Sequence, residues 1–223
     1  MFHTGSRQHW TPAGELVFVR RDTEQVELYA DGAGEAMVLP AGAGLIQSPD
    51  GKWTLGGFMP ESTRLPERTS DELGHVNRTE IATGQRQVLF DESAVWEIHP
   101  RPDIARRYRM AFKQNQWFSR GDRFFSVYTN EEGVKDKSGD FEYLKSVIVA
   151  DADGSHLRYL GEIGHHPTPT PDGRGVLCYD DARSCLRDGH VQDGQDLIRL
   201  DLETGKRTRI QTQAEGTHPS YSP

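Results

Sequence analysis

The chain has 223 residues with 35% hydrophobic content, which suits one domain with a layered core. Its 26 Lys and Arg against 34 Asp and Glu give a net charge of −8 without a basic run, which argues against a nucleic-acid partner. No stretch reaches the roughly 18 apolar residues of a membrane-spanning helix, and no secretory signal opens the chain, so we expect no membrane partner and a cytoplasmic protein. A periplasmic location is the alternative if the true N-terminus is missing. Cys178 and Cys185 are expected to be reduced thiols.

One repeated unit runs along the chain: a polar or aromatic lead-in, a tight turn and an apolar run. In chain order it begins at Gln8, Leu45, Gln116 and His166, and its opening recurs at His218. A Pro-Asp-Gly or Ala-Gly pair between extended segments predicts a turn, because proline presets φ and glycine accepts positive φ. Each unit is therefore predicted to begin with a β-hairpin.

A second hairpin follows in each of the first four units. These segments start at Val26, Val76, Ser146 and Leu197, alternate in polarity and turn at Asp-Gly or Thr-Gly. Four strands per unit, recurring every 37 to 70 residues, predict an all-β fold, a β-propeller of four-stranded antiparallel blades. A parallel β-helix would need shorter repeats, and an immunoglobulin sandwich would not repeat internally.

The turn positions give the expected number of blades. They are Pro12, Pro49, Ser119, Pro171 and Pro223. The first four mark complete blades and the last marks the start of a fifth. We therefore expect residues 1–223 to form a single propeller domain that is incomplete at its C-terminus, from a parent with six to eight blades, seven being favoured.

Two long segments interrupt the repeat between the second and third turns. FMPESTRLPERTSDELGH starts at Phe58, and WEIHPRPDIARRYRM starts at Trp96. Both are interpreted as irregular loops at one mouth of the barrel, where binding residues commonly lie. Trp96, Arg106 and Arg109 are predicted to contact an anionic sugar. The alternatives are a Trp packed at a blade interface and a solvated arginine face.

The repeats resemble those of two known groups of propellers. SPDGK at Ser48, TPDGR at Thr170 and ADADGSHLRYL at Ala150 are similar to the repeats of periplasmic TolB-type propellers and of oligogalacturonide lyases, and NQWFSRGDRFF at Asn115 favours the lyases. The resemblance implies a cytoplasmic seven-bladed enzyme that cleaves galacturonide oligomers by β-elimination. It further implies a divalent metal, typically manganese, held by histidines and a glutamine, with a histidine base and an arginine beside the uronate carboxylate. The alternative is a noncatalytic TolB-type propeller that binds a protein or another ligand.

A polar ring is predicted around the central channel. Five residues before each turn position the chain has Arg7, Gly44, Gln114, His166 and His218. Because the strand that leads into this turn is commonly the innermost one, these residues would share one level of the channel. Two imidazoles, an amide and a guanidinium could bind a divalent ion and an anionic sugar together.

The predicted chemistry at this ring is removal of the proton next to a uronate carboxylate. A neutral His166 would take the proton, and Arg7 or the metal would stabilise the enolate-like charge. His218, His166 and His9 are the candidate metal ligands, and Gln114 is a candidate substrate contact. The alternative for the histidines is structural, because a His-Pro pair can start a strand whose imidazole bonds to a neighbouring blade.

Overall fold

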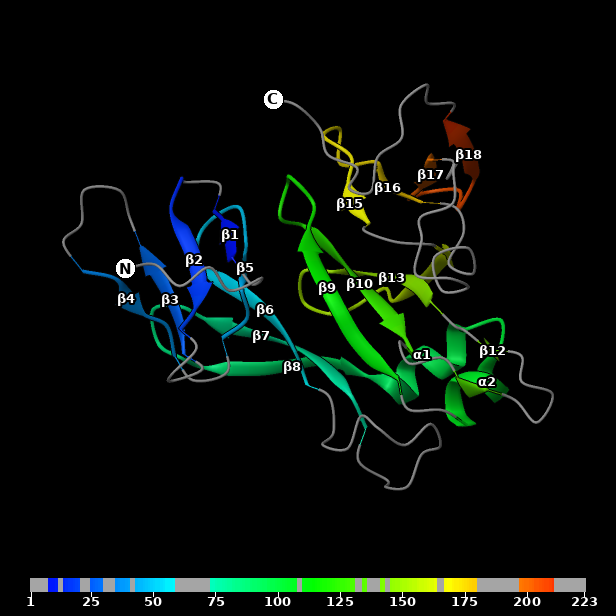
Figure 1. Ribbon diagram of the computed structural model, residues 1–223, viewed down its shortest axis with the longest axis horizontal. Coiled ribbons are helices and arrows are strands. Elements are labelled where there is room, and N and C mark those ends of the chain that lie inside the picture. Colours follow the sequence, from blue (N-terminus) through cyan, green and yellow to red (C-terminus); the bar gives the residue numbers. More distant parts are fainter. Residues whose placement is uncertain are drawn as a thin grey trace.

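The computed structural model forms four antiparallel four-stranded sheets, which confirms the β-propeller architecture (Figure 1). It describes residues 8–11, 14–20, 25–29, 35–40, 43–58, 73–107, 110–130, 134–135, 141–142, 145–163, 167–179 and 197–210. Within each sheet the strands follow one another in chain order, so each blade is a meander with its first strand at one edge and its fourth at the other.

The first two blades contain the strands from β1 to β8. Blade 1 consists of β1 (Gln8–Trp10), β2 (Leu16–Val19), β3 (Val26–Tyr29) and β4 (Met37–Val38). Blade 2 consists of β5 (Ile46–Gln47), β6 (Trp53–Phe58), β7 (His75–Glu80) and β8 (Arg86–Asp91). Both hairpins predicted for each of these units are confirmed.

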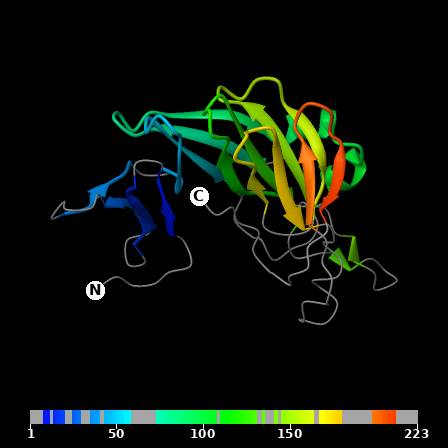
Figure 2. The same cartoon turned by 90° about the horizontal axis from the view of Figure 1, so that it is seen from above.

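The last two blades lie side by side when the molecule is seen from above (Figure 2). Blade 3 consists of β9 (Ala111–Trp117), β10 (Arg123–Thr129), β13 (Lys145–Asp151) and β14 (Arg158–Glu162). Blade 4 consists of β15 (Thr168–Pro169), β16 (Gly175–Tyr179), β17 (Leu197–Asp201) and β18 (Arg207–Ile210). A separate short hairpin of β11 (Val134–Lys135) and β12 (Phe141–Glu142) interrupts blade 3.

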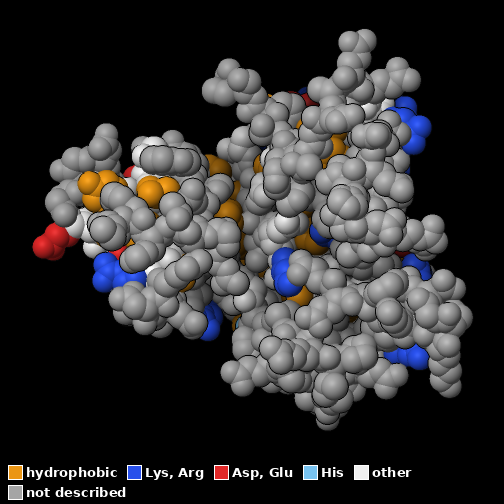
Figure 3. Space-filling view, in the orientation of Figure 1, with side chains coloured by type: hydrophobic (Ala, Val, Ile, Leu, Met, Phe, Trp, Pro, Cys, Tyr) orange, Lys and Arg blue, Asp and Glu red, His pale blue; other side chains and the backbone are white. Residues whose placement is uncertain are grey.

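The hydrophobic core lies between the blades, in three layers that we call interfaces 1/2, 2/3 and 3/4. Successive residues of a strand point to opposite faces of its sheet, so one strand can serve two layers. On β10, Phe124 packs into interface 2/3 whereas Phe125 packs into interface 3/4. Interface 1/2 is built around Val17, Val26 and Leu28. Figure 3 shows apolar side chains along the seam between blade 1, on the left, and the rest of the molecule.

The first strands of blades 2, 3 and 4 lie side by side on the inner side of the arc. β9 contacts both β5 and β15, so the first strands of three successive blades are neighbours. This arrangement agrees with the expectation that the lead-in strands are innermost.

The first turns of the blades all lie at one end of the strands, which we call the turn face. The turn glycines Gly51, Gly121 and Gly173 have φ of 72°, 70° and 64°, a backbone region that favours glycine. In the second blade the Ser48 hydroxyl donates to Asp50 at 2.6 Å, and the Asp50 carboxylate accepts from the Lys52 backbone N–H at 3.1 Å. The hydroxyl hydrogen bond is the main reason that the pKa of Asp50 is lowered.

Several turn glycines lie against the blade before their own. A Cβ added to Gly121 would lie 3.2 Å from Pro49 in the preceding turn, and one on Gly173 would lie 3.2 Å from the Ser119 hydroxyl. The second hairpins repeat this contact, because a Cβ on Gly154 would lie 2.7 Å from the Leu89 carbonyl oxygen of blade 2. The glycine repeat therefore serves the docking of blades as well as the turns.

Two short helices replace part of a segment that was interpreted as an irregular loop, and that interpretation is wrong for them. Helix α1 (Glu92–Ile98) begins where the Asp91 carboxylate accepts from two backbone N–H groups, and α2 (Pro102–Arg107) begins with a proline, whose fixed φ suits a first helical residue. They bury Val95, Ile104 and Ala105 in interface 2/3. Apolar spacing over so few residues is too short to show helical periodicity.

The helices lie at the end of the strands opposite the turn face, which we call the insert face (Figure 1). β8 runs away from the turn face and leads directly into α1. No helix among the described residues is long and apolar enough to cross a membrane. Cys178 is buried as a free thiol, and this burial raises its pKa to about 12, whereas Cys185 lies outside the described residues.

Candidate functional site

The predicted site residues divide into those that the structure describes and those that it does not. Gln114, Trp96 and Arg106 are described. His9 lies on β1, but its side chain is outside the described part. The other predicted site residues lie outside the described ranges: they are Arg7, Arg109, His166 and His218. Their roles stay predictions.

Gln114 lies on the innermost strand β9 in an unusual backbone conformation. Its φ is +51°, a left-handed value that costs a residue with a Cβ about 1–2 kcal/mol. The cause is a β-bulge: Gln116 pairs with Phe125 and Lys113 with Val127, so two residues of β9 oppose one residue of β10. The exposed Gln114 side chain is thereby taken out of the regular alternation of the strand.

The residues after Gln114 connect β9 to the blades on either side. Asn115 is buried, and its amide nitrogen lies 3.4 Å from the position that a Cβ on Gly57 of blade 2 would take. The Gln116 amide donates to the carbonyl oxygen of Pro167, at the start of blade 4, at 3.1 Å. With its neighbours engaged in the scaffold, Gln114 is the residue of this stretch that is exposed for a ligand.

Gly44, the other described member of the predicted ring, has a purely structural role. A Cβ there would lie 1.6 Å from the Leu55 carbonyl oxygen, which leaves no space for a side chain. Its backbone N–H donates to the Thr54 hydroxyl at 3.1 Å. At the level of the predicted polar ring, blade 2 therefore contributes backbone atoms and no side chain.

Trp96 and Arg106 do come together, although on helices and at the insert face. The Arg106 guanidinium lies 5.6 Å from the centre of the Trp96 ring and 3.3 Å from the Glu97 carboxylate. The Trp96 indole N–H donates to the Tyr128 hydroxyl at 3.3 Å, which anchors the ring on interface 2/3. Both side chains thus have structural partners, and their contact with a sugar stays a prediction.

His99 is the most buried histidine of the described residues, with 4% of its surface exposed. Its Nδ1 accepts the backbone N–H of Arg101 at 3.0 Å, so the ring proton is on Nε2, which faces the Ser146 hydroxyl at 3.1 Å. A protonated Nε2 cannot take a proton from Ser146, so this pair does not form a nucleophile and base. Burial lowers the pKa of His99, and the ring holds the helices on blade 3 as a neutral group.

The described residues were also compared with the expected metal site. No three His, Cys, Asp or Glu side chains in the described ranges form a group that could hold a metal ion. Of the predicted ligands, two histidines and the imidazole of the third lie outside those ranges. The described residues by themselves do not fit a divalent ion.

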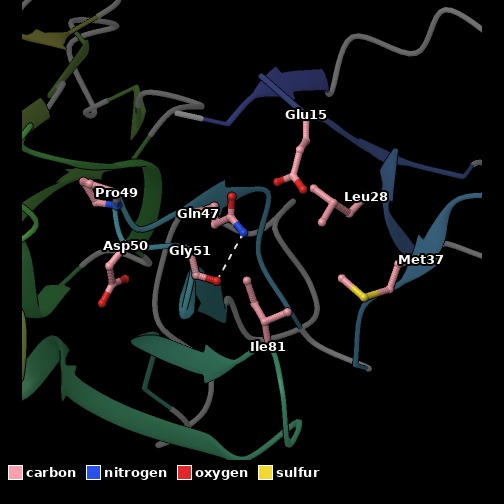
Figure 4. A pocket seen from close by; sticks show the side chains of 8 residues that line it. All are labelled: Glu15, Leu28, Met37, Gln47, Pro49, Asp50, Gly51 and Ile81. Carbon is pink, nitrogen blue, oxygen red and sulfur yellow. Dashed lines mark hydrogen bonds between the residues drawn. The ribbon is translucent and has the colours of Figure 1, made fainter. Parts of the chain in front are cut away.

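A cleft between blades 1 and 2 is a feature that the sequence interpretation missed. It has a volume of about 360 Å³ and lies between Glu15, Leu28 and Met37 on one side and Gln47 and Ile81 on the other (Figure 4). One difference between the repeats signals this cleft in the sequence. Two residues before the turn position, the second unit has Gln47 where the third unit has the larger Trp117.

Comparison with known proteins gives matches among solved structures. No protein-family model matches the chain, and no curated protein matches it. TolB from Acinetobacter baumannii has a TM-score of 0.56 at 16% identity, over 97% of this chain and 46% of that one. An oligogalacturonate lyase in complex with manganese has a TM-score of 0.59 at 13% identity, over 95% of this chain and 54% of the lyase.

A further oligogalacturonate lyase, from Vibrio parahaemolyticus, has a TM-score of 0.60 at 12% identity, over 97% of this chain and 56% of the lyase. The fold is a β-propeller similar to TolB and to these lyases. At such identities the likeness shows the fold alone. The chain spans about half the length of these propellers.

Proposed function

We propose that the chain is part of a carbohydrate-active propeller that binds an oligogalacturonide and cleaves it by β-elimination. Gln114 carries the proposal, because a bulge with left-handed backbone exposes its amide on the innermost strand. Bulges concentrate next to active sites, where they re-aim a side chain. The fold likeness to two oligogalacturonate lyases supports the proposal.

The proposed reaction uses residues of the polar ring. Arg7 pairs with the uronate carboxylate, and Gln114 hydrogen bonds to sugar hydroxyl groups. Neutral His166 takes the proton from the carbon next to the carboxylate. The electron pair of that C–H bond forms a carbon–carbon double bond as the glycosidic C–O bond breaks. The glycosidic oxygen leaves with the other sugar and takes a proton from water to become a hydroxyl group.

A divalent cation, manganese in the first instance, is proposed as the cofactor, with His218 and His9 as its ligands. His166, the third candidate ligand, acts here as the base instead, because the single lone pair of a neutral imidazole cannot both bind the cation and accept the proton. Imidazole suits such borderline ions, and a bound cation would lower the energy of a carboxylate that gains charge. Because the described residues do not form a metal site, no step above depends on the ion.

The test is an assay of the 223-residue protein with oligogalacturonate, following the ultraviolet absorbance of the unsaturated uronide. Variant Gln114→Asn shortens the amide and tolerates the left-handed backbone, and we expect it to lower kcat/KM about tenfold through a weaker hydrogen bond to substrate. His166→Ala is expected to lower kcat at least about 100-fold. His156→Ala, in the exposed second turn of blade 3, is the control. The proposal fails if no absorbance appears with or without manganese, and manganese leaves Tm unchanged.

A protein-binding scaffold is the second candidate. Met37 and Val38, on the outermost strand of blade 1, expose 48% and 51% of their surfaces, and Figure 3 shows apolar side chains on this part of the molecule. An inactive chain that captures a partner, and loses it in a Met37→Glu variant, would favour the scaffold over the lyase.

A further inference from the structure

The cleft between blades 1 and 2 has two chemically different halves. Leu28, Met37 and Ile81 supply an apolar wall, and the Glu15 carboxylate and Gln47 amide supply oxygen atoms from opposite blades (Figure 4). A volume of about 360 Å³ lies within the range of small-molecule sites, about 300–1,000 Å³.

The Glu15 carboxylate points into the cleft without a cationic partner among the described residues. It accepts one hydrogen bond, from the Thr11 hydroxyl at 3.2 Å, which belongs to its own turn. The nearby Asp50 differs, because it is held in its turn by Ser48 and pairs with Lys52 at 3.9 Å. Its carboxylate points away from the cleft in Figure 4. Glu15 therefore supplies the negative charge of the site.

The Gln47 amide is fixed with its oxygen toward the cleft. Its side chain is buried, with 7% of the residue exposed, and its nitrogen donates to the Gly51 carbonyl oxygen at 3.3 Å. A carbonyl can only accept, so this hydrogen bond assigns the nitrogen and leaves the Gln47 oxygen on the side of Glu15 (Figure 4). No described residue donates to that oxygen. The oxygen is open to the cleft, so it can accept a hydrogen bond from a ligand that donates.

Interface 2/3 differs from interface 1/2 at the position of Gln47. The residue that corresponds to Gln47 in the next unit is Trp117, and its indole is 7% exposed and packs edge-on against Phe124 at 5.5 Å. The same position in interface 2/3 is thus filled by a large ring. Replacement of that ring by an amide opens the space and adds an acceptor.

We propose that this cleft binds an aliphatic cation, a primary ammonium group on a short hydrocarbon chain. The ammonium lies between the Glu15 carboxylate and the Gln47 oxygen, and the chain lies along Leu28, Met37 and Ile81. Ammonium donates in three directions and matches two converging oxygen atoms. The site is independent of the channel chemistry proposed above.

The test is calorimetric titration of the whole protein with n-butylammonium, and with n-butanol as a neutral probe of similar shape. We expect n-butylammonium to bind and n-butanol to bind at least about tenfold more weakly, because the charged hydrogen bonds are lost. A parallel titration with lysine blocked at both backbone ends identifies the source. Binding equal to that of the free amine assigns the site to a peptide side chain, and weaker binding assigns it to a free amine.

Two variants and a control complete the test. Glu15→Gln is expected to weaken n-butylammonium at least about tenfold, and Gln47→Trp to abolish binding by filling the space. Asp122→Asn removes the carboxylate at the position of blade 3 that corresponds to Glu15, and it should leave binding unchanged. Equal binding of butanol and butylammonium, or unchanged binding in Glu15→Gln, would overturn the proposal even if Gln47→Trp does not fold.

Discussion

Interfaces 2/3 and 1/2 are built from corresponding positions of one repeat, and yet they differ in what they can do. Interface 2/3 contains an aromatic cluster in which Phe90 stacks on Phe124 at 6.1 Å and Trp117 meets it edge-on. Interface 1/2 has a smaller aliphatic cluster and the cleft. The comparison teaches that the Trp117 ring fills in interface 2/3 a position that the Gln47 amide leaves open in interface 1/2.

The largest difference is expected from truncation of the two cores. Phe124→Ala should lower the free energy of unfolding by about 3–5 kcal/mol, because it leaves a large cavity in a fully buried layer. Leu28→Ala borders an existing cleft and should cost only about 2 kcal/mol. Urea unfolding measures both. Equal losses would show that the two interfaces are equally well packed.

The second expected effect concerns the docking of turns on the preceding blade. Gly154→Ala should cost at least about 2 kcal/mol, because the residue has φ +87° and its Cβ would lie 2.7 Å from the Leu89 oxygen. Gly14→Ala shares the positive φ, +81°, but its Cβ meets no atom within 4 Å. It should cost only about 1 kcal/mol. Thermal unfolding of the two variants separates the cost of the contact with Leu89 from the cost of the positive φ. Equal shifts in Tm would show that the contact adds no cost.

A third test gives interface 1/2 the aromatic residue that interface 2/3 has at the corresponding position. Gln47→Trp should raise the free energy of unfolding by about 1 kcal/mol, because the indole fills the cleft as Trp117 fills its own layer. Gln47→Ala, which loses the hydrogen bond to Gly51 and fills nothing, is the matched variant and should destabilise. A destabilised Gln47→Trp would mean that the two layers are not equivalent in shape.

The smallest expected effect is a pH dependence at the edge of interface 2/3. Burial lowers the pKa of folded His99 below its ordinary 6.5, and it outweighs the hydrogen bond from the Arg101 backbone N–H and the charge of Glu162, which oppose the shift. As the pH falls below 6.5 the unfolded chain gains a proton that the folded chain resists, so stability should fall until the folded pKa is reached. His99→Gln should flatten this part of a urea-midpoint profile from pH 7 to 5. An unchanged profile in His99→Gln would show that His99 does not cause the fall.

Much of the fold follows from the sequence, because its turns have a local mechanism. Pro-Asp-Gly and Asp-Gly pairs place hairpins without knowledge of tertiary contacts, and the four described blades agree with them. The helices were missed because Val95 and Ile104 become buried only through packing against blades 2 and 3. The bulge at Gln114 was missed for a related reason, since it arises from the shift in register between β9 and β10 opposite Ser126.

The candidate site was predicted less completely. Alignment on the turn placed Gln114 on the innermost strand, but it could not show that Gly44 has no space for a side chain. It also could not show that Trp96 and Arg106 would be held by Tyr128 and Glu97. The cleft depends on the difference between the Gln47 amide and the Trp117 ring at corresponding positions of neighbouring layers. Alignment records this difference as a substitution, and only the packing shows that it leaves a space.

The contacts that several turn glycines make with the preceding blade give the molecule a direction of assembly. Gly84 lies against Pro40, Gly154 against Leu89 and Gly173 against Ser119, so the later segment always meets a surface that was synthesised earlier. A ribosome releases these segments in the same order, and each new hairpin finds its platform already complete. Reordering the blades by circular permutation would leave the contacts intact but reverse their timing at the new junction.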